Sequence, residues 1–338
     1  MKKRYLIAGA TGVAGGALAL KLLMRPRDVV WAEHRERLHH AERSRFQSVR
    51  GVRVHYQEAG PKDAPPLLLI HGFCASNLVW SDVLLPIAEA GFRVIAPDLL
   101  GFGFSEKPRD GEYTIEAQAR MITGLMKELG IERAMLVGSS YGGAVAATCA
   151  LDEPERVSRL VLVGAVSNDE AKRQPMLRLA AWPLMGDLIS PLLVDSYSLM
   201  RRRMKKLYAK ANAQIFDEQR AEAHHRPLRA AATQRAALRT LRRWRAGRIE
   251  AEAHRIKQPT LLVWGEGDAE IPLRHGQRLH ASIPDARLIV FRRCGHLPQE
   301  EYPREFASLI ADFCKGATGT ADAADKEAPE SALAAESA

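Results

Sequence analysis

The chain has few of the residues that build metal sites, disulfide frameworks and nucleic-acid platforms. Its 338 residues include only four cysteines, and no two of them stand in a CxxC pair. This scatter argues against a metal site or a disulfide framework, so we expect four free thiols. Aromatic residues make up 6% of the chain, which is too few for the stacking platforms of single-stranded nucleic-acid binders. The four cysteines are Cys74, Cys149, Cys294 and Cys314.

An excess of positive charge is also absent from most of the chain, although the net charge is +9. Residues 171–258 hold 20 lysines and arginines against 7 acidic residues, and residues 316–338 hold one lysine against five acids. The rest is neutral overall. The excess therefore describes one local surface, and we expect no nucleic-acid partner. The acidic, alanine-rich segment 316–338 has no apolar period and is predicted to be a disordered tail.

A long stretch that is nearly free of charge opens the chain. Residues 5–24 contain a single charged residue, Lys21, and basic residues stand on both sides of the stretch. Twenty mainly apolar residues are just long enough to cross a bilayer as a helix. We therefore predict a membrane anchor over residues 1–30, followed by a linker over 31–45. Because both flanks are positive, the side of the membrane that the body faces stays open.

Two alternatives stay open for the same stretch. One is a cleaved signal peptide, although no clear A-x-A site precedes Arg25. The other is a dinucleotide-binding loop, since residues 6–15 (LIAGATGVAG) resemble the phosphate loop of extended short-chain dehydrogenases. A dinucleotide-binding unit needs further strand–helix repeats, and the chain does not continue in that form beyond residue 50. We expect no cofactor.

Apolar runs alternate with helical stretches over residues 46–167 and again over 258–315. This alternation predicts an α/β fold with a doubly wound, mostly parallel sheet. Between the two parts, residues 168–257 show only helical segments rich in Ala, Arg, Leu and Met, which predicts an inserted helical domain. The expected strands lie near 46–49, 52–56, 67–70, 92–96, 134–137, 157–164, 259–264 and 286–291, and the expected helices near 80–90, 114–129, 144–151, 273–282 and 304–313.

The segment Val137–Gly143 (VGSSYGG) stands between an apolar run and a helical run of small residues. The pattern Gly138-x-Ser140-x-Gly142 in that setting is typical of a nucleophile elbow. A residue held in a sharp turn lifts its side chain clear of the sheet, and the neighbouring positions must then be nearly free of atoms. Ser140 is the candidate nucleophile.

A serine nucleophile needs a base, and the base needs an orienting acid. In doubly wound hydrolases the acid and then the histidine follow the nucleophile along the chain. Asp268 follows one predicted strand and His296 follows the last, at the edge of the sheet where functional side chains gather. Glu266 and Glu270 are close rivals of Asp268. His71 follows an earlier strand and is interpreted as a residue that holds its loop.

Five motifs that follow one another along residues 46–315 resemble those of the α/β-hydrolase fold. The resemblance implies that Ser140 attacks a carbonyl carbon, that His296 takes its proton and that Asp268 orients the imidazole. It also implies an oxyanion hole from the backbone amides of Phe73 and Tyr141, and a helical cap over residues 168–257. The motifs are His71-Gly72-Phe73, the loop Asp98…Gly101-x-Gly103-x-Ser105, Gly138-x-Ser140-x-Gly142-Gly143, Gly265…Asp268…Pro272 and Gly295-His296.

The elbow residues also limit the function. Haloalkane dehalogenases and soluble epoxide hydrolases of this family carry Asp where this chain has Ser140. Ser139 stands where esterases often have His or Asn, and Tyr141 where Met is common, so both departures leave the substrate class open. As for other serine hydrolases, we expect the substrate to be a small molecule or a lipid.

The overall plan, an anchor followed by a capped hydrolase, resembles membrane-bound monoacylglycerol lipases. It implies a serine esterase acting on lipid-like carboxylic esters at a membrane, for which we expect the bacterial inner membrane. The basic runs 201–206 and 241–245 fit either anionic headgroups or solvated helix faces. Two other functions stay open: a hydrolase that cleaves carbon–carbon bonds of ring-fission products, and a ligand receptor with slow turnover.

Overall fold

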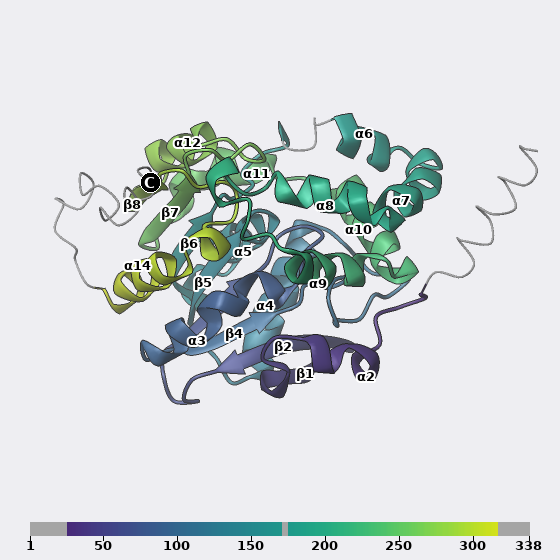
Figure 1. The fold of residues 1–338 in the computed structure, drawn as a ribbon. Helices are drawn as coiled ribbons and strands as arrows, with labels where there is room; N and C mark the ends of the chain where they lie inside the picture. The colour runs from purple at the N-terminus through teal and green to yellow at the C-terminus, as the bar shows by residue number, and fades with distance from the viewer. Residues whose placement is uncertain (1–25, 171–174, 317–338) are drawn as a thin grey trace, which may run out of the picture.

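The computed structural model describes residues 26–170 and 175–316, and an eight-stranded sheet forms its centre (Figure 1). The strand order is β1-β2-β4-β3-β5-β6-β7-β8. β2 pairs antiparallel with β1 and β4, and every other pair is parallel, so the prediction of a mostly parallel sheet is confirmed. The strands are β1 (Ser44–Val49), β2 (Val52–Ala59), β3 (Pro66–Ile70), β4 (Arg93–Pro97), β5 (Ala134–Ser139), β6 (Val157–Val163), β7 (Thr260–Gly265) and β8 (Ala286–Phe291).

Helices cover both faces of the sheet, which is why the central strands are continuous apolar runs. Every residue of β5 and β7 is buried. One face packs against α4 (Ile115–Glu128), α5 (Tyr141–Asp152) and α12 (Arg274–Ser282). The other packs against α3 (Ser81–Glu89) and α14 (Pro303–Lys315). This arrangement brings the loops after the parallel strands to one edge of the sheet.

The chain between β6 and β7 is helical, as predicted, and its helices lie together on one side of the sheet in Figure 1. The helix α10 has the clearest apolar stripe, and its residues Ala232, Ala236, Leu238 and Leu241 are buried. We call this insertion the cap. Its helices are α6 (Pro175–Ala181), α7 (Met185–Asp195), α8 (Tyr197–Lys205), α9 (Glu218–Leu228), α10 (Ala231–Arg243) and α11 (Gly247–Glu252).

The first described residues are attached to the cap. The carbonyl oxygens of Pro26 and Arg27 accept hydrogen bonds from the amides of Ala231 and Ala232, at 2.8 and 2.9 Å. The predicted linker contains a short α-helix, α2 (Trp31–His34), and two 3-10 turns, Arg35–Arg37 and Ala41–Arg43. The predicted anchor falls mainly on residues 1–25 and the predicted tail on 317–338, both outside the described residues. Within the described ranges, no helix combines the length and the apolar character that crossing a bilayer requires.

Candidate active site

Ser140 lies in a strained turn between β5 and α5. Its φ of 55° and ψ of −119° are a backbone conformation that residues other than glycine rarely adopt. The glycines beside it leave no space for a side chain: a Cβ on Gly138 would lie 2.3 Å from the carbonyl oxygen of Gly142. A Cβ on Gly142 would lie 2.2 Å from the carbonyl oxygen of Ile70. The predicted elbow is therefore present, and its glycines are sterically required.

His296 and Asp268 form a buried pair. The imidazole Nδ1 lies 2.7 Å from Oδ2 of Asp268, and the two residues are 4% and 5% exposed. The other carboxylate oxygen, Oδ1, accepts hydrogen bonds from the amides of Glu270 and Ile271, at 2.9 and 2.8 Å. Because the loop holds one oxygen, the other is fixed toward the ring, and the basic position of the imidazole is Nε2.

The rivals of Asp268 have other partners. Glu270 accepts hydrogen bonds from Nη2 of Arg203 at 2.9 and 3.2 Å. Glu266 accepts a hydrogen bond from the amide of Arg293 at 3.3 Å. Among the three acidic residues of this loop, Asp268 is therefore the one that contacts the imidazole.

The three predicted residues converge on the end of β6. The amide of Ser140 donates to the carbonyl oxygen of Val163 at 2.8 Å. The next residue, Gly164, lies against the histidine and the aspartate, because a Cβ there would be 3.1 Å from both Nδ1 of His296 and Oδ2 of Asp268. The structure thus brings the backbone of the nucleophile candidate and the side chains of the base and acid candidates to the same end of β6, where a Ser-His-Asp triad requires them.

The charge around His296 suits a base. Burial disfavours the charged imidazole, but the carboxylates of Asp268, Glu270 and Glu301 favour it, and together they raise the pKa of His296. A raised pKa strengthens the neutral ring as a proton acceptor. It also means that the base is lost to protonation at a higher pH than for an ordinary histidine.

The two predicted oxyanion-hole residues flank Ser140. Tyr141 is the first residue of α5, where backbone N–H groups have no partner within the helix. Phe73 follows Gly72, and a Cβ on Gly72 would lie 3.1 Å from Cβ and 3.6 Å from Oγ of Ser140. Both amides therefore belong to backbone that passes directly beside the serine.

His71 holds its loop, as the sequence indicated. Its Nε2 accepts a hydrogen bond from the amide of Leu99 at 2.9 Å, and its Nδ1 donates to the carbonyl oxygen of Gly72 at 2.8 Å. Burial lowers the pKa of His71, which keeps the ring neutral in this role. Sequence reasoning missed a second buried pair behind this loop, in which Nδ1 of His55 lies 2.7 Å from Oδ2 of Asp98. The pair anchors the loop that precedes Ser105.

The cap contributes an aromatic residue that was also missed. Trp244 is 3% exposed, and its ring centroid lies 5.0 Å from that of Tyr141 and 5.6 Å from that of Phe73. The interpretation of run 241–245 as a headgroup surface is therefore wrong for Trp244 and for Leu241, which is also buried. These three rings contact one another and form an aromatic cluster next to the elbow.

Two arginines of the other basic run, 201–206, form ion pairs with acidic residues of the same chain. Arg203 is bound to Glu270, and Arg201 lies 3.3 Å from Glu218.

The thiols nearby do not compete as nucleophiles. All four cysteines are free, and burial raises the pKa of Cys74 to about 12 and the pKa of Cys294 as well.

Comparison with known proteins places the chain in a family. The family model of the alpha/beta hydrolase fold matches residues 65–303, so the chain belongs to this family, as its motifs predicted. A 2-hydroxy-6-oxo-6-phenylhexa-2,4-dienoate hydrolase of Comamonas testosteroni is 35% identical over 277 residues, which are 78% of this chain and 91% of the relative. A 2-hydroxymuconate semialdehyde hydrolase of Pseudomonas sp. (strain CF600) is 32% identical and covers 80% of this chain and 93% of its own length.

One solved structure aligns over more of the chain. It is described as a membrane phospholipase A, a novel bacterial virulence factor, and is 26% identical with a TM-score of 0.69. The alignment covers 94% of this chain and all of that chain. The relatives thus include a hydrolase named for a dienoate, a hydrolase named for a semialdehyde and a structure named as a phospholipase A.

Proposed function

We propose that this protein is a serine hydrolase that works through an acyl-enzyme. Ser140 attacks an acyl carbonyl carbon, His296 takes the hydroxyl proton and passes it to the leaving group, and Asp268 holds the imidazolium. Water then releases the acyl group by the same steps. The observation that carries this proposal is the buried 2.7 Å contact between His296 and Asp268 beside the strained turn of Ser140. The amides of Phe73 and Tyr141 would stabilise the oxyanion by about 3 kcal/mol each.

The substrate class with most support is a ring-fission product whose carbon–carbon bond is hydrolysed. Both curated relatives above are named as hydrolases of such compounds, and they match over more than nine-tenths of their length. The aromatic cluster of Phe73, Tyr141 and Trp244 places apolar rings beside the elbow, and such surroundings favour an apolar, aromatic substrate over a polar one. In this reaction the leaving atom is a carbon, so the proton from His296 must be delivered to carbon.

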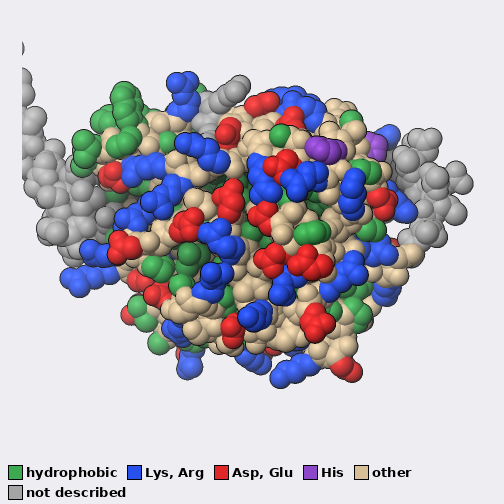
Figure 2. All heavy atoms as spheres, turned by 180° about the vertical axis from the view of Figure 1, so that it is seen from behind, with side chains coloured by type: hydrophobic (Ala, Val, Ile, Leu, Met, Phe, Trp, Pro, Cys, Tyr) green, Lys and Arg blue, Asp and Glu red, His purple; other side chains and the backbone are tan. Residues whose placement is uncertain are grey.

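A lipid-like carboxylic ester is the second candidate, and two observations favour it. The phospholipase structure aligns over 94% of this chain, against 78–80% for the dienoate hydrolases. The cap also exposes large apolar side chains around the junction of α6 and α7, a surface we call the apolar cap face. Figure 2 shows an apolar cluster at one end of the molecule, and the residues of the apolar cap face are Leu179, Trp182, Leu184, Met185 and Leu188.

A substrate panel separates the candidates. The purified protein is assayed with 2-hydroxy-6-oxo-6-phenylhexa-2,4-dienoate, whose turnover is measured as a loss of visible absorbance. It is also assayed with p-nitrophenyl esters of increasing acyl length. We expect turnover of the dienoate with a kcat/KM at least about tenfold above that of any ester. The opposite ranking, with a preference for long acyl chains, would replace the first candidate by the second. Covalent labelling of Ser140 by a fluorophosphonate without turnover of either class would favour the slow ligand receptor.

We also propose that the protein binds a membrane, specifically the bacterial inner membrane, through the predicted anchor and the apolar cap face. Pro26, the first described residue after the predicted anchor, is hydrogen-bonded to Ala231 of the cap. An anchored chain would therefore hold the cap close to the bilayer. Trp182 and Leu188 are 65% and 61% exposed, and such side chains partition into the interface of a bilayer.

Vesicle flotation tests this proposal. We expect the full chain to float with vesicles that contain anionic lipid, and a chain starting near residue 31 to bind more weakly. In that shorter chain, Trp182→Gln with Leu188→Gln should remove most of the remaining binding, because about 2 kcal/mol of apolar transfer is lost per side chain. Val290→Gln is the matched control, since Val290 is also exposed but lies on β8, away from the cap. Equal flotation of the full and shortened chains would contradict the proposed anchor.

A further inference from the structure

A segment of the cap touches both loops that carry the triad candidates. Arg203, at the end of α8, binds Glu270 on the loop of Asp268. Four residues later, the carbonyl oxygen of Leu207 accepts a hydrogen bond of 2.6 Å from the amide of His296. The cap is therefore in direct contact with the acid loop and with the backbone of the base itself.

The contact with the histidine loop is close enough to require glycine. A Cβ on Gly295 would lie 2.4 Å from the carbonyl oxygen of Leu207 and 2.7 Å from the amide nitrogen of Ala209. The backbone of the cap thus lies directly on the backbone that precedes His296. A displacement of one by a few tenths of an ångström must move the other.

Glu301 joins these two backbones through the two oxygens of one carboxylate. Its Oε1 accepts a hydrogen bond from the amide of Gly295 at 2.8 Å. Its Oε2 accepts hydrogen bonds from the amide of Ala209 at 3.0 Å and from Nδ2 of Asn212 at 2.9 Å. The side chain is 5% exposed, so these bonds are formed away from water. One oxygen holds the histidine loop and the other holds the cap.

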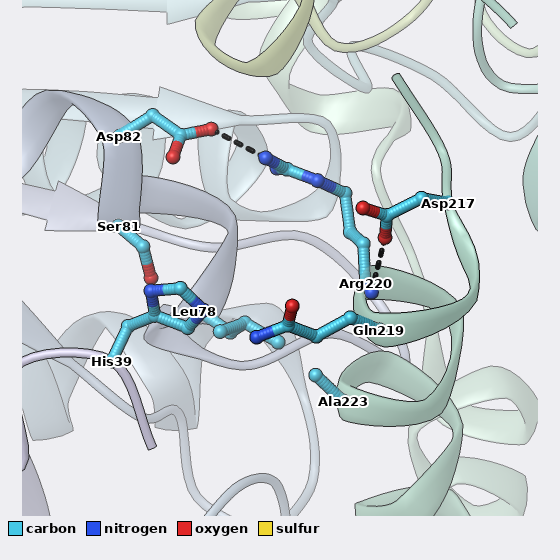
Figure 3. A pocket seen from close by; sticks show the side chains of 8 residues that line it. All are labelled: His39, Leu78, Ser81, Asp82, Asp217, Gln219, Arg220 and Ala223. Atoms are coloured by element: carbon cyan, nitrogen blue, oxygen red, sulfur yellow. Dashed lines mark hydrogen bonds and ion pairs between the residues drawn. The ribbon is translucent and has the colours of Figure 1, made fainter. Parts of the chain in front are cut away.

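The neighbouring Glu300 makes a second connection of the same kind. Its Oε2 accepts hydrogen bonds from the hydroxyl of Tyr208 at 2.5 Å and from Arg220 at 2.6 Å. Arg220 reaches further, to Asp82 on α3 at 2.8 Å, across the pocket drawn in Figure 3. Glu300 therefore ties the same cap segment to the body at a second point, one residue from Glu301.

We propose that Glu301 is a positioning residue, which sets the place of the His296 imidazole relative to Ser140 by locking the histidine loop to the cap segment Leu207–Asn212. The inference rests on the proposed function, because a base that must reach the serine hydroxyl tolerates errors of only about half an ångström. It also means that an intact cap and an aligned base are one structural state. A cap that lifts at this segment would withdraw the hydrogen bonds that fix His296.

The chemistry of the side chain supplies a sharp variant. A carboxylate accepts from all three donors, whereas the amide of glutamine offers one acceptor oxygen and one donating NH2 group. In Glu301→Gln, the new NH2 group must therefore face another donor, on the side of either Gly295 or the cap. The shape and volume of the side chain hardly change. Glu305→Gln is the matched control, because Glu305 is an exposed carboxylate on the following helix, α14.

The test measures the rate at which a fluorophosphonate labels Ser140, together with kcat and KM on the best substrate and the thermal midpoint of unfolding. For Glu301→Gln we expect labelling and kcat to fall about tenfold or more with KM within about twofold, because alignment is lost and binding is kept. A purely structural role would lower the unfolding midpoint and leave the labelling rate of the folded fraction unchanged. The proposal is overturned if Ser140 of the Glu301→Gln variant is labelled at a rate within about twofold of that of the natural protein, while Glu305→Gln is labelled at the natural rate.

A second variant covers the case in which Glu301→Gln does not fold. Asn212→Ala removes two bonds that Nδ2 of this half-buried residue donates, the one to Glu301 and one of 3.0 Å to the carbonyl oxygen of Arg293 on the histidine loop. We expect it to slow labelling by about threefold or more, and an unchanged rate would then count against the proposal. If the natural protein itself is not labelled at Ser140, the proposed function fails. If the natural protein is labelled and both variants match it, only the positioning role fails.

Discussion

Ser140→Ala is expected to lower kcat by about a millionfold and to abolish fluorophosphonate labelling. Without the hydroxyl no acyl-enzyme forms, and the rate that remains comes from substrate binding and the oxyanion amides alone. The backbone of the elbow should persist, because its steric requirement rests on Gly138 and Gly142. The measurement is kcat on the best substrate of the panel, with mass spectrometry of the labelled peptide.

Ser139→Ala is the matched control for this change. Ser139 is the last residue of β5, is 2% exposed and carries the same hydroxyl one position earlier. Ser139 lies inside the buried strand, whereas Ser140 lies in the turn beyond it, so the control should keep labelling and most of the activity. Labelling that survives in Ser140→Ala and disappears in Ser139→Ala would show that the nucleophile is Ser139 and not Ser140.

The sheet and the triad candidates could be predicted because their signals are local. Each buried strand is a short apolar run, and the sharp turn at Ser140 requires glycines within two residues of it. Asp268 and His296 each follow such a strand, and parallel strands bring their loops to one edge. The order of five motifs then indicated the family, which the family model confirms.

The contacts of the cap could not be predicted in the same way, because they join residues far apart in the chain. Glu301 lies on α13 (Pro298–Glu301), a helix of four residues with no periodic signal, and its partners Ala209 and Asn212 are about 90 positions earlier. Trp244 stands among arginines, which suggested a surface. It directly follows α10, and its position against Tyr141 follows from tertiary packing and not from its neighbours in the sequence.

The substrate class stays a proposal for a related reason. It depends on side chains that the cap places opposite the elbow, and the sequence identifies neither their spacing nor their orientation. Departures such as Tyr141 in the elbow were visible in the sequence. Their meaning became readable only when the structure placed Tyr141 against Phe73 and Trp244.

Asp268→Asn is expected to lower kcat by about ten-thousandfold while the loop stays folded. The bonds from the amides of Glu270 and Ile271 can persist on the amide oxygen, which then turns the NH2 group toward His296. A donor in that place favours the imidazole tautomer with its proton on Nε2, and that tautomer cannot accept the proton of Ser140. The residue keeps its shape and loses its charge, so the variant isolates orientation and electrostatics from packing.

The pH dependence gives this variant a second, independent readout. With Asp268 present the pKa of His296 is raised, so the acidic limb of kcat/KM should have its midpoint above about 6.5, and activity should fall as pH drops through it. In Asp268→Asn the charge that favours the imidazolium is lost while burial remains, so the limb should shift to lower pH. Glu266→Gln is the control, since this nearby carboxylate bonds the amide of Arg293, and it should leave kcat within about twofold and the limb in place. A limb that moves in Glu266→Gln and stays fixed in Asp268→Asn would mean that the base is oriented by a different acid.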